Sequence, residues 1–214
     1  MKWSYIEGDT DTTLVYYATT TNIEDHCTWQ ASTLDYVLSF YNKQTFNKCI
    51  DIGANYGYLS VGFSRHFNTV ESFEISSVIR EHLLLNTSTF DNIKIHSKGL
   101  YNKEGEVQFK LHTSSGVSRI TDSQSNAVEK VTTLDSYSFK DVDLIKIDVE
   151  HSELEVIQGS IDTISTYKPV LVVEMDLRRN NDSLTNRQKV FDILFNLGYY
   201  IADIRHNDVL FLTK

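Results

Sequence analysis

An acid and two glycines close a short apolar run in residues 48–57, Lys-Cys-Ile-Asp-Ile-Gly-Ala-Asn-Tyr-Gly. This pattern predicts a buried strand, a tight turn and a helix N-terminus, where backbone N–H groups and the positive helix end can surround a ligand. The dinucleotide fingerprint needs a second glycine two positions after the first, but Gly53 is followed by Ala54 and Asn55. Asp51 would repel a pyrophosphate and attract an ammonium or a sulfonium. The charge therefore favours S-adenosylmethionine over a nicotinamide dinucleotide, with a ligand-free turn as the alternative.

A second acid follows at a distance typical of nucleotide sites. Residues 70–75, Val-Glu-Ser-Phe-Glu-Ile, predict the next strand, and Glu74 lies near its end, 23 positions after Asp51. In strand–helix–strand nucleotide sites, an acid roughly 20 residues past the glycine turn accepts hydrogen bonds from ribose hydroxyls. Glu74 is predicted to have that role.

Further acids follow the later predicted strands. Ligands of open α/β sheets bind beyond the carboxyl ends of the strands. The residues at those ends are Asp51, Glu74, Ser97–Leu100, Asp148, Glu150, His151, Glu174 and Asp176. Like charges at close range disfavour one another unless a cation intervenes. A cationic cofactor would supply that relief, and so would Mg²⁺ or Ca²⁺ on Asp148, Glu150, Glu174 and Asp176, but the metal is not the favoured reading.

The elements that must position these residues alternate between strands and helices. Alternation of this kind predicts a mostly parallel sheet with right-handed crossovers and helices on both faces. Residues 199–204 and 209–213 predict a final hairpin, so the last strand is antiparallel. The predicted strands are 48–52, 70–75, 93–97, 143–149 and 170–175, and the predicted helices are 56–67, 77–88, 152–167 and 184–197.

Two regions lie outside this alternation. Residues 99–134 predict an antiparallel excursion with a strand at 107–111, and the polar segment 113–127 predicts a long loop that covers the site or contacts substrate. A helix is predicted over 29–42. We expect residues 1–46 to form an arm and a helix packed on the site, and residues 47–214 to form one globular α/β unit.

Composition excludes several classes of protein. The chain of 214 residues has a net charge of −9, which disfavours a nucleic-acid partner because such binding needs basic surface. No apolar run reaches the roughly 18 residues of a membrane span, and the first residues lack a signal-peptide pattern. Two cysteines, Cys27 and Cys49, are too few for a disulfide framework, so a cytoplasmic location is expected. The single proline, Pro169, excludes the Pro-Pro and Pro-Cys motifs of amino and cytosine-carbon methylation.

Four stretches resemble the FkbM family of S-adenosylmethionine-dependent methyltransferases, in the family's order. They are residues 50–58, 70–74, 131–137 and 142–150 with its continuation 153–159, and Pro169–Glu174 adds the family's fifth strand ending. The resemblance implies a Rossmann-like class I methyltransferase fold over 47–214. It also implies O-methylation of a hydroxyl on a sugar, a glycan or a related small molecule. The candidate cofactor residues are Asp51, Gly53, Asn55, Gly57, Tyr58, Glu74, Gly99 and Leu100.

Transfer of a methyl group to an alcohol needs alignment and a base within hydrogen-bond reach. The candidate bases are Asp148, Glu150 and His151. The family usually has Gly-Ala after the Val-Glu pair, whereas this chain has His151 and Ser152, a departure at the mouth of the site that concerns the substrate pocket and the base. Lys146 is predicted to be buried and to need a partner, for which Asp148, two positions on and on the same face, is one candidate. A degenerate domain that binds cofactor or glycan without turnover is the alternative function.

Overall fold

The computed structural model describes residues 2–11, 37–39, 46–122, 124–175 and 181–214. Of the predicted helix 29–42, only residues 37–39 fall in this part of the chain, and they are helical. The rest of that helix and Asp176 lie outside the described residues.

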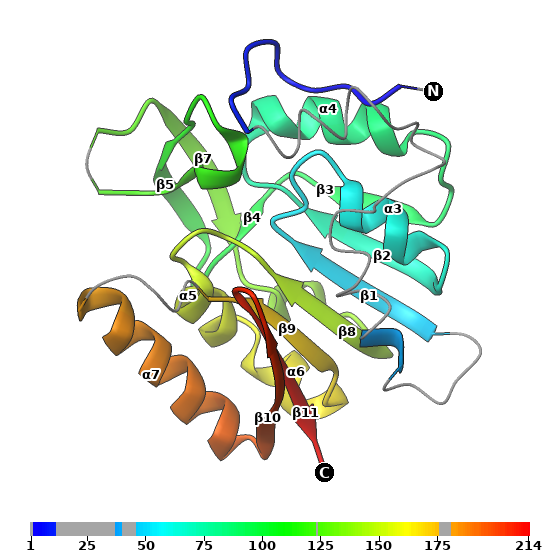
Figure 1. Cartoon of the computed structure of the whole chain (residues 1–214), viewed down its shortest axis with the longest axis vertical. Coiled ribbons are helices and arrows are strands. Elements are labelled where there is room, and N and C mark those ends of the chain that lie inside the picture. The colour runs from blue at the N-terminus through cyan, green and yellow to red at the C-terminus, as the bar shows by residue number, and fades with distance from the viewer. Residues whose placement is uncertain (1, 12–36, 40–45, 123, 176–180) are drawn as a thin grey trace.

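A seven-stranded sheet forms the centre of the molecule and confirms the predicted fold class (Figure 1). Its order is β10-β11-β9-β8-β1-β2-β3, with β3, β2, β1, β8 and β9 parallel and β11 and β10 antiparallel. The strands are β1 (Phe46–Ile52), β2 (Phe67–Phe73), β3 (Ile93–His96), β8 (Val142–Ile147), β9 (Val170–Glu174), β10 (Tyr199–Arg205) and β11 (Asp208–Thr213). The carboxyl ends of the five parallel strands therefore share one edge.

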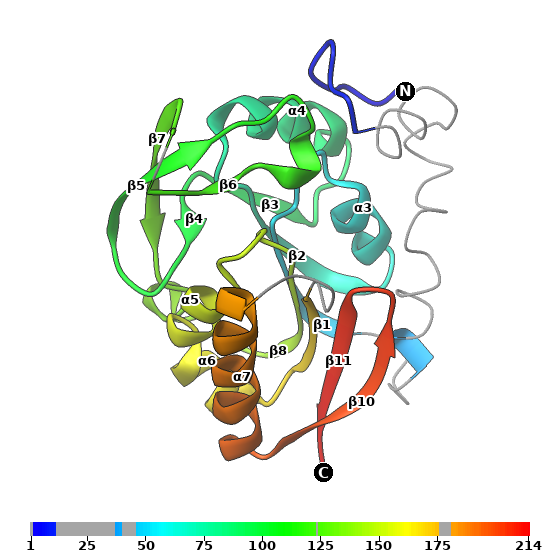
Figure 2. The same ribbon diagram turned by 60° about the vertical axis from the view of Figure 1, so that its left-hand side comes forward.

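Helices cover both faces of this sheet (Figures 1 and 2). On one face α5 (Glu153–Gln158), α6 (Ile161–Tyr167) and α7 (Asn181–Asn196) pack on strand residues such as Ile50 and Ile145. On the other face, α3 (Tyr58–Ser64) packs on Cys49 and Leu144, and α4 (Ser77–Thr87) lies beside it. Neighbouring residues of one strand, such as Cys49 and Ile50, pack against the helices of opposite faces, because successive side chains of a strand point to opposite sides of the sheet.

The first helix is shorter than the predicted 56–67. It begins at Tyr58 because Gly57 before it has a φ of 94°, which is left-handed backbone. It ends at Ser64, and β2 begins at Phe67 rather than at residue 70. Phe67 is paired with Phe46 in the sheet and packs on Phe63, so burial of these aromatic rings starts the strand early.

The predicted helix 152–167 is two helices, α5 and α6. The Ser152 side chain makes no capping hydrogen bond; instead, the Glu153 carboxylate accepts from the backbone N–H of His151 at 2.9 Å. The break falls at Gly159, where a Cβ would overlap the backbone carbonyl of Tyr101. The close approach of residues 101–102 therefore interrupts the helix.

The predicted antiparallel excursion forms a second, four-stranded sheet of order β4-β7-β5-β6. Its strands are β4 (Gly99–Leu100), β5 (Gly105–Lys110), β6 (Arg119–Ile120) and β7 (Ala127–Thr132). The segment predicted as a polar loop, 113–127, holds β6 and the 3₁₀ turn η1 (Ser115–Val117). A further 3₁₀ turn, η2 (Asp135–Tyr137), leads into β8. Figure 2 shows this small sheet beyond the carboxyl ends of the main strands.

We expect Gly159→Ala to lower the free energy of unfolding by about 2–3 kcal/mol, because overpacking against backbone is not relieved by side-chain rotation. Urea denaturation would measure it. The neighbouring exposed residue provides a control, since Gln158→Ala should stay within about 0.5 kcal/mol of the wild type. Equal stability of the two variants would contradict the role given to Gly159.

Candidate functional site

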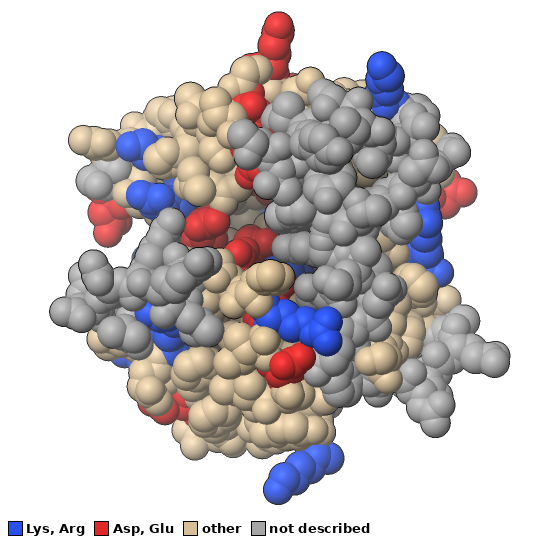
Figure 3. Space-filling view, in the orientation of Figure 1, with Lys and Arg blue, Asp and Glu red and all other residues tan. Residues whose placement is uncertain are grey.

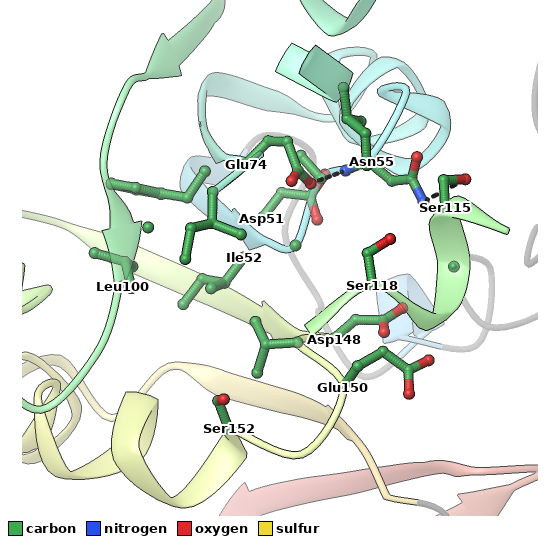
Figure 4. Close-up of a pocket in the computed structure, with 18 of the residues that line it drawn as sticks. Asp51, Ile52, Asn55, Glu74, Leu100, Ser115, Ser118, Asp148, Glu150 and Ser152 are labelled. Carbon is green, nitrogen blue, oxygen red and sulfur yellow. Dashed lines mark hydrogen bonds between the residues drawn. The ribbon is translucent and has the colours of Figure 1, made fainter. Parts of the chain in front are cut away.

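The carboxyl ends of the main strands open into a cavity of about 200 Å³, far larger than the about 30 Å³ of one water. Every predicted cofactor residue lines it except Gly57: the lining includes Asp51, Gly53, Asn55, Tyr58, Glu74, Gly99 and Leu100. Figure 4 shows Asp51, Asn55 and Glu74 at one end and Asp148 and Glu150 at the other. Residues far apart in the sequence therefore share one chamber.

Gly57 has a packing role instead. A Cβ at this position would lie 2.7 Å from Leu83 Cδ1 and 3.2 Å from Thr87 Cγ2, both on α4. Together with its left-handed backbone, this contact explains why a glycine precedes α3. Its place in the cofactor motif therefore reflects the packing of α3 against α4, not a place in the wall of the cavity.

The glycine turn does not offer an N–H cradle to an anion. The N–H groups of Gly53 and Ala54 both donate to the Phe73 carbonyl at 2.9 Å, and the N–H of Asn55 donates to Glu74 Oε2 at 3.0 Å. A Cβ at Gly53 would overlap the Asp148 carbonyl, so only glycine lets the turn lie against the end of β8. The turn thus joins three strand ends and leaves carboxylates, rather than amide donors, to face the cavity. This geometry is unsuited to a pyrophosphate.

Two carboxyl groups at this end are deeply buried. Asp51 is 1% exposed and Glu74 is 6% exposed. Burial raises the pKa of Asp51 to about 6, although the Ser60 hydroxyl donates to it at 2.5 Å. Burial likewise raises the pKa of Glu74 to about 7, against hydrogen bonds from the backbone N–H groups of Ser76 and Asn55. A ligand that brings positive charge or hydroxyl donors would favour the ionised forms.

Asn55 carries a further unmet acceptor. Its Nδ2 lies 3.5 Å from Ser115 Oγ, while its Oδ1 is buried and has no hydrogen-bond partner among the described residues (Figure 4). A buried acceptor without a partner costs free energy unless a ligand or water fills the role. The residues of this end therefore fit a cofactor with amino or hydroxyl donors and a positive charge.

The other end of the cavity holds three carboxyl groups. One oxygen from each of Asp148, Glu150 and Glu174 lies within 4.8 Å of the others. The charge of Asp148 and the hydrogen bond between the two carboxyl groups raise the pKa of Glu174 to about 9, so this pair holds a proton to a higher pH than a free carboxyl group does. In the space-filling view, acidic side chains lie beside the hollow in the centre of this face (Figure 3).

A buried lysine lies beneath this end. Lys146 is 1% exposed, and its Nζ lies 3.3 Å from Asp148 Oδ2, as predicted, and 3.2 Å from Asp208 Oδ1. Burial acts to raise the pKa of Asp148, but Lys146 and the proton on Glu174 outweigh it and hold that pKa below its usual value. The sequence gives no signal for Asp208, which the final hairpin brings beside Glu174.

The structure places the candidate bases and the candidate metal ligands of this end differently from one another. His151 does not line the cavity and its side chain is exposed, whereas Glu150 lines it. Both residues have positive φ, 47° at Glu150 and 81° at His151. Of the metal set, Asp148, Glu150 and Glu174 come together, while Asp176 lies outside the described residues.

Several lining residues were not predicted as site residues. Asp11 comes from the N-terminal arm, and Ser115, Gly116 and Ser118 come from the turn between β5 and β6. No motif marks them; only the length and polarity of 113–127 indicated a role. Within the described ranges, no helix has the length and apolar character needed to cross a membrane.

The fold and the cavity define the class of the protein: a Rossmann-like class I methyltransferase. The family model described as methyltransferase FkbM domain matches residues 51–201. The chain therefore belongs to the FkbM methyltransferase family, as its motifs predicted.

Solved structures support the fold. A methyltransferase FkbM from Methylobacillus flagellatus KT aligns with a TM-score of 0.62 at 17% identity, covering 97% of this chain and 55% of that one. The chain thus spans little more than half of that protein. A methyltransferase from Streptococcus mutans in complex with SAH aligns with a TM-score of 0.51 at 9% identity, covering 86% and 97%.

A third structure concerns the acceptor. The M1A22 tRNA methyltransferase of B. subtilis aligns with a TM-score of 0.50 at 11% identity, covering 85% of this chain and 65% of that one. The fold by itself therefore does not exclude a nucleic-acid acceptor. The search of curated proteins found no match.

The protonated state of Glu174 predicts a pH effect on stability. Its folded pKa of about 9 lies above the ordinary value of 4.5, so unfolding releases a proton between these pH values and stability falls as pH rises through them. Glu174→Gln removes this titration, so the variant should lose less stability than the wild type between pH 5 and 9. Urea denaturation across that range measures it, with the exposed Glu81→Gln as control. If the free energy of unfolding changed with pH in the same way for Glu174→Gln and the wild type, the raised pKa assigned to Glu174 would be contradicted.

Proposed function

We propose that this protein binds S-adenosylmethionine and transfers its methyl group to a hydroxyl of an uncharged sugar, glycan or related small molecule. One observation carries the proposal: a single cavity joins the Asp51–Glu74 end to the Asp148–Glu150–Glu174 end. A cofactor site and a base for the acceptor would then face the same chamber. When bound, the cofactor supplies an electrophilic methyl group on a positively charged sulfur.

At the cofactor end, each residue has a separate task. Glu74 would accept hydrogen bonds from ribose hydroxyls. Asp51 would place negative charge near the cationic part, and Asn55 Oδ1 would accept from a donor of the ligand. Gly99 lets the Ile75 side chain pack against the backbone in the wall, since a Cβ there would lie 2.7 Å from Ile75 Cγ1. Tyr58, packed on Trp3 with ring centroids 4.1 Å apart, closes another side.

The charge of the cavity supports an uncharged acceptor. Its described lining contains the carboxyl groups of Asp11, Asp51, Glu74, Asp148, Glu150 and Glu174 and no Lys, Arg or His. Phosphate groups near these acids would be repelled, whereas hydroxyls can donate to them. The net charge of −9 acts in the same direction against a nucleic-acid acceptor.

Among the candidate bases, we favour Glu150. Asp148 is held by Lys146 and by the proton on Glu174, which lowers its affinity for another proton. Glu150 lines the cavity within 4.8 Å of both acids, on a left-handed backbone that places it there. The proposal needs no metal ion, because Lys146 and the Glu174 proton already offset charge in this cluster.

A domain that binds cofactor or glycan without turnover is the second candidate. The departure from the family at His151 pointed to it, but that side chain is exposed and lies outside the lining of the cavity. An assay of S-adenosylhomocysteine release over a panel of hydroxylated acceptors separates the two. Release above the no-acceptor background supports the enzyme, and binding without release across the panel supports the alternative.

Calorimetric titration tests the cofactor end. We expect S-adenosylhomocysteine to bind the wild type and NAD to produce no heat. Glu74→Gln should weaken S-adenosylhomocysteine binding by about tenfold or more, since a hydrogen bond to a charged group is worth about 1.5–3 kcal/mol. Glu81→Gln, an exposed change on α4, should bind like the wild type. Wild-type binding to NAD alone would overturn the cofactor assignment.

Turnover tests the base. With an acceptor found in the panel, Glu150→Gln should lower kcat by about 10²–10⁴-fold, the usual contribution of a general base. His151→Gly should keep kcat, because its side chain is exposed and glycine tolerates the φ of 81°. Full activity in Glu150→Gln, or a large loss in His151→Gly, would show that the base is misassigned.

A further inference from the structure

The described part of the N-terminal arm, residues 2–11, is fastened to the methyltransferase fold at two places. At the first, the Ser4 N–H donates to Asn86 Oδ1 at 2.6 Å, and Asn86 Nδ2 donates back to the Ser4 carbonyl at 2.9 Å. Trp3 is buried against Tyr58 beside this contact. This attachment fixes the arm on α4, away from the acids of the cavity.

The second attachment is centred on the carboxylate of Asp9. Its Oδ2 accepts from the hydroxyl of Tyr56 at 2.5 Å, and Tyr56 is fully buried. Its Oδ1 accepts from the N–H of Ser115 at 3.2 Å and from the N–H of Asp11 at 2.8 Å. One side chain therefore joins the arm, the turn before α3 and the η1 turn of the second sheet.

Backbone contacts strengthen the junction between the arm and the η1 turn. The N–H of Thr10 donates to the Thr113 carbonyl at 2.8 Å. A Cβ at Gly116 would lie 2.5 Å from Asp11 Oδ2, so the Asp11 side chain lies directly against the η1 turn. Asp11, Ser115 and Gly116 all line the cavity, so this junction is part of its wall.

The wall is connected to the predicted cofactor residues. Ser115 is 5% exposed, and its Oγ lies 3.5 Å from Asn55 Nδ2. The N–H of Asn55 in turn donates to Glu74 Oε2 at 3.0 Å. A chain of contacts thus runs from Asp9 through Ser115 and Asn55 to Glu74, and the labelled part of it is visible in Figure 4.

We propose that Asp9 is a positioning residue for the cofactor site: it holds the η1 turn and residues 10–11 as the wall that retains the cofactor. This inference rests on the proposed function. Asp9 does not line the cavity, so it acts through Ser115 and Asn55. Loss of its carboxylate releases Ser115 without removing any group that faces the ligand.

The experiment compares Asp9→Ala with Ser4→Ala, which alters the arm at its other attachment, where Ser4 Oγ lies 2.7 Å from His82 Nδ1. Hydrogen exchange of the unliganded chain is measured first. In Asp9→Ala, exchange of residues 113–118 should rise about tenfold or more, while β1 and β8 keep wild-type protection. Ser4→Ala should leave residues 113–118 unchanged. Unchanged exchange of these residues in Asp9→Ala overturns the inference.

Dissociation of S-adenosylhomocysteine, followed by stopped-flow, is the second measurement. Asp9→Ala should release it about tenfold faster than the wild type, Asp9→Asn should recover part of the loss because its amide oxygen still accepts from Ser115, and Ser4→Ala should match the wild type. Faster exchange with an unchanged dissociation rate overturns the inference. If the wild type fails to bind S-adenosylhomocysteine, the proposed function fails, and the exchange measurement, which needs no ligand, decides whether Asp9 positions the wall.

Discussion

The structure depends on a single buried cation in its central sheet. Lys146 on β8 is surrounded by Asp148, Glu174 and Asp208, which come from the ends of β8, β9 and β11. The charge of Asp148 and burial raise the pKa of Glu174, so this cluster holds a proton more tightly than a free carboxyl group does. The ion pairs therefore join three strands and also set which acids at the acceptor end of the cavity are ionised.

At the other end of the cavity, the glycine turn that follows β1 decides which groups face a ligand. Its N–H groups are used to bind the Phe73 carbonyl and Glu74, so the turn offers the cavity no amide donors from Gly53 to Asn55. The groups that face the cavity at this end are the buried carboxyl groups of Asp51 and Glu74. The same strand–turn–helix layout that binds phosphates in dinucleotide proteins is thus suited here to a ligand rich in donors and positive charge.

The small second sheet and the arm complete the cavity from outside the main fold. Asp11, Ser115 and Ser118 reach the cavity from segments that carry no motif. The carboxylate of Asp9, which does not line the cavity, accepts hydrogen bonds from the N–H groups of Asp11 and Ser115. Loops of this kind vary more easily than sheet strands, which makes them the natural place for differences in ligand contact within one fold.

The sequence by itself determined the parallel sheet, the positions of Asp51, Glu74, Asp148, Glu150 and Glu174 at its edge, and the partner of Lys146, because these follow from strand periodicity and local spacing. It did not show that Gly57 packs against α4 and lies outside the lining of the cavity, it joined α5 and α6, and it gave His151 the same standing as Glu150. Only the tertiary structure decided that the pKa of Glu174 is raised, that Asp208 shares Lys146, and that Asp9 accepts from the N–H of Ser115. Burial and charge balance depend on contacts between residues that are distant along the chain, and local pattern carries no information about them.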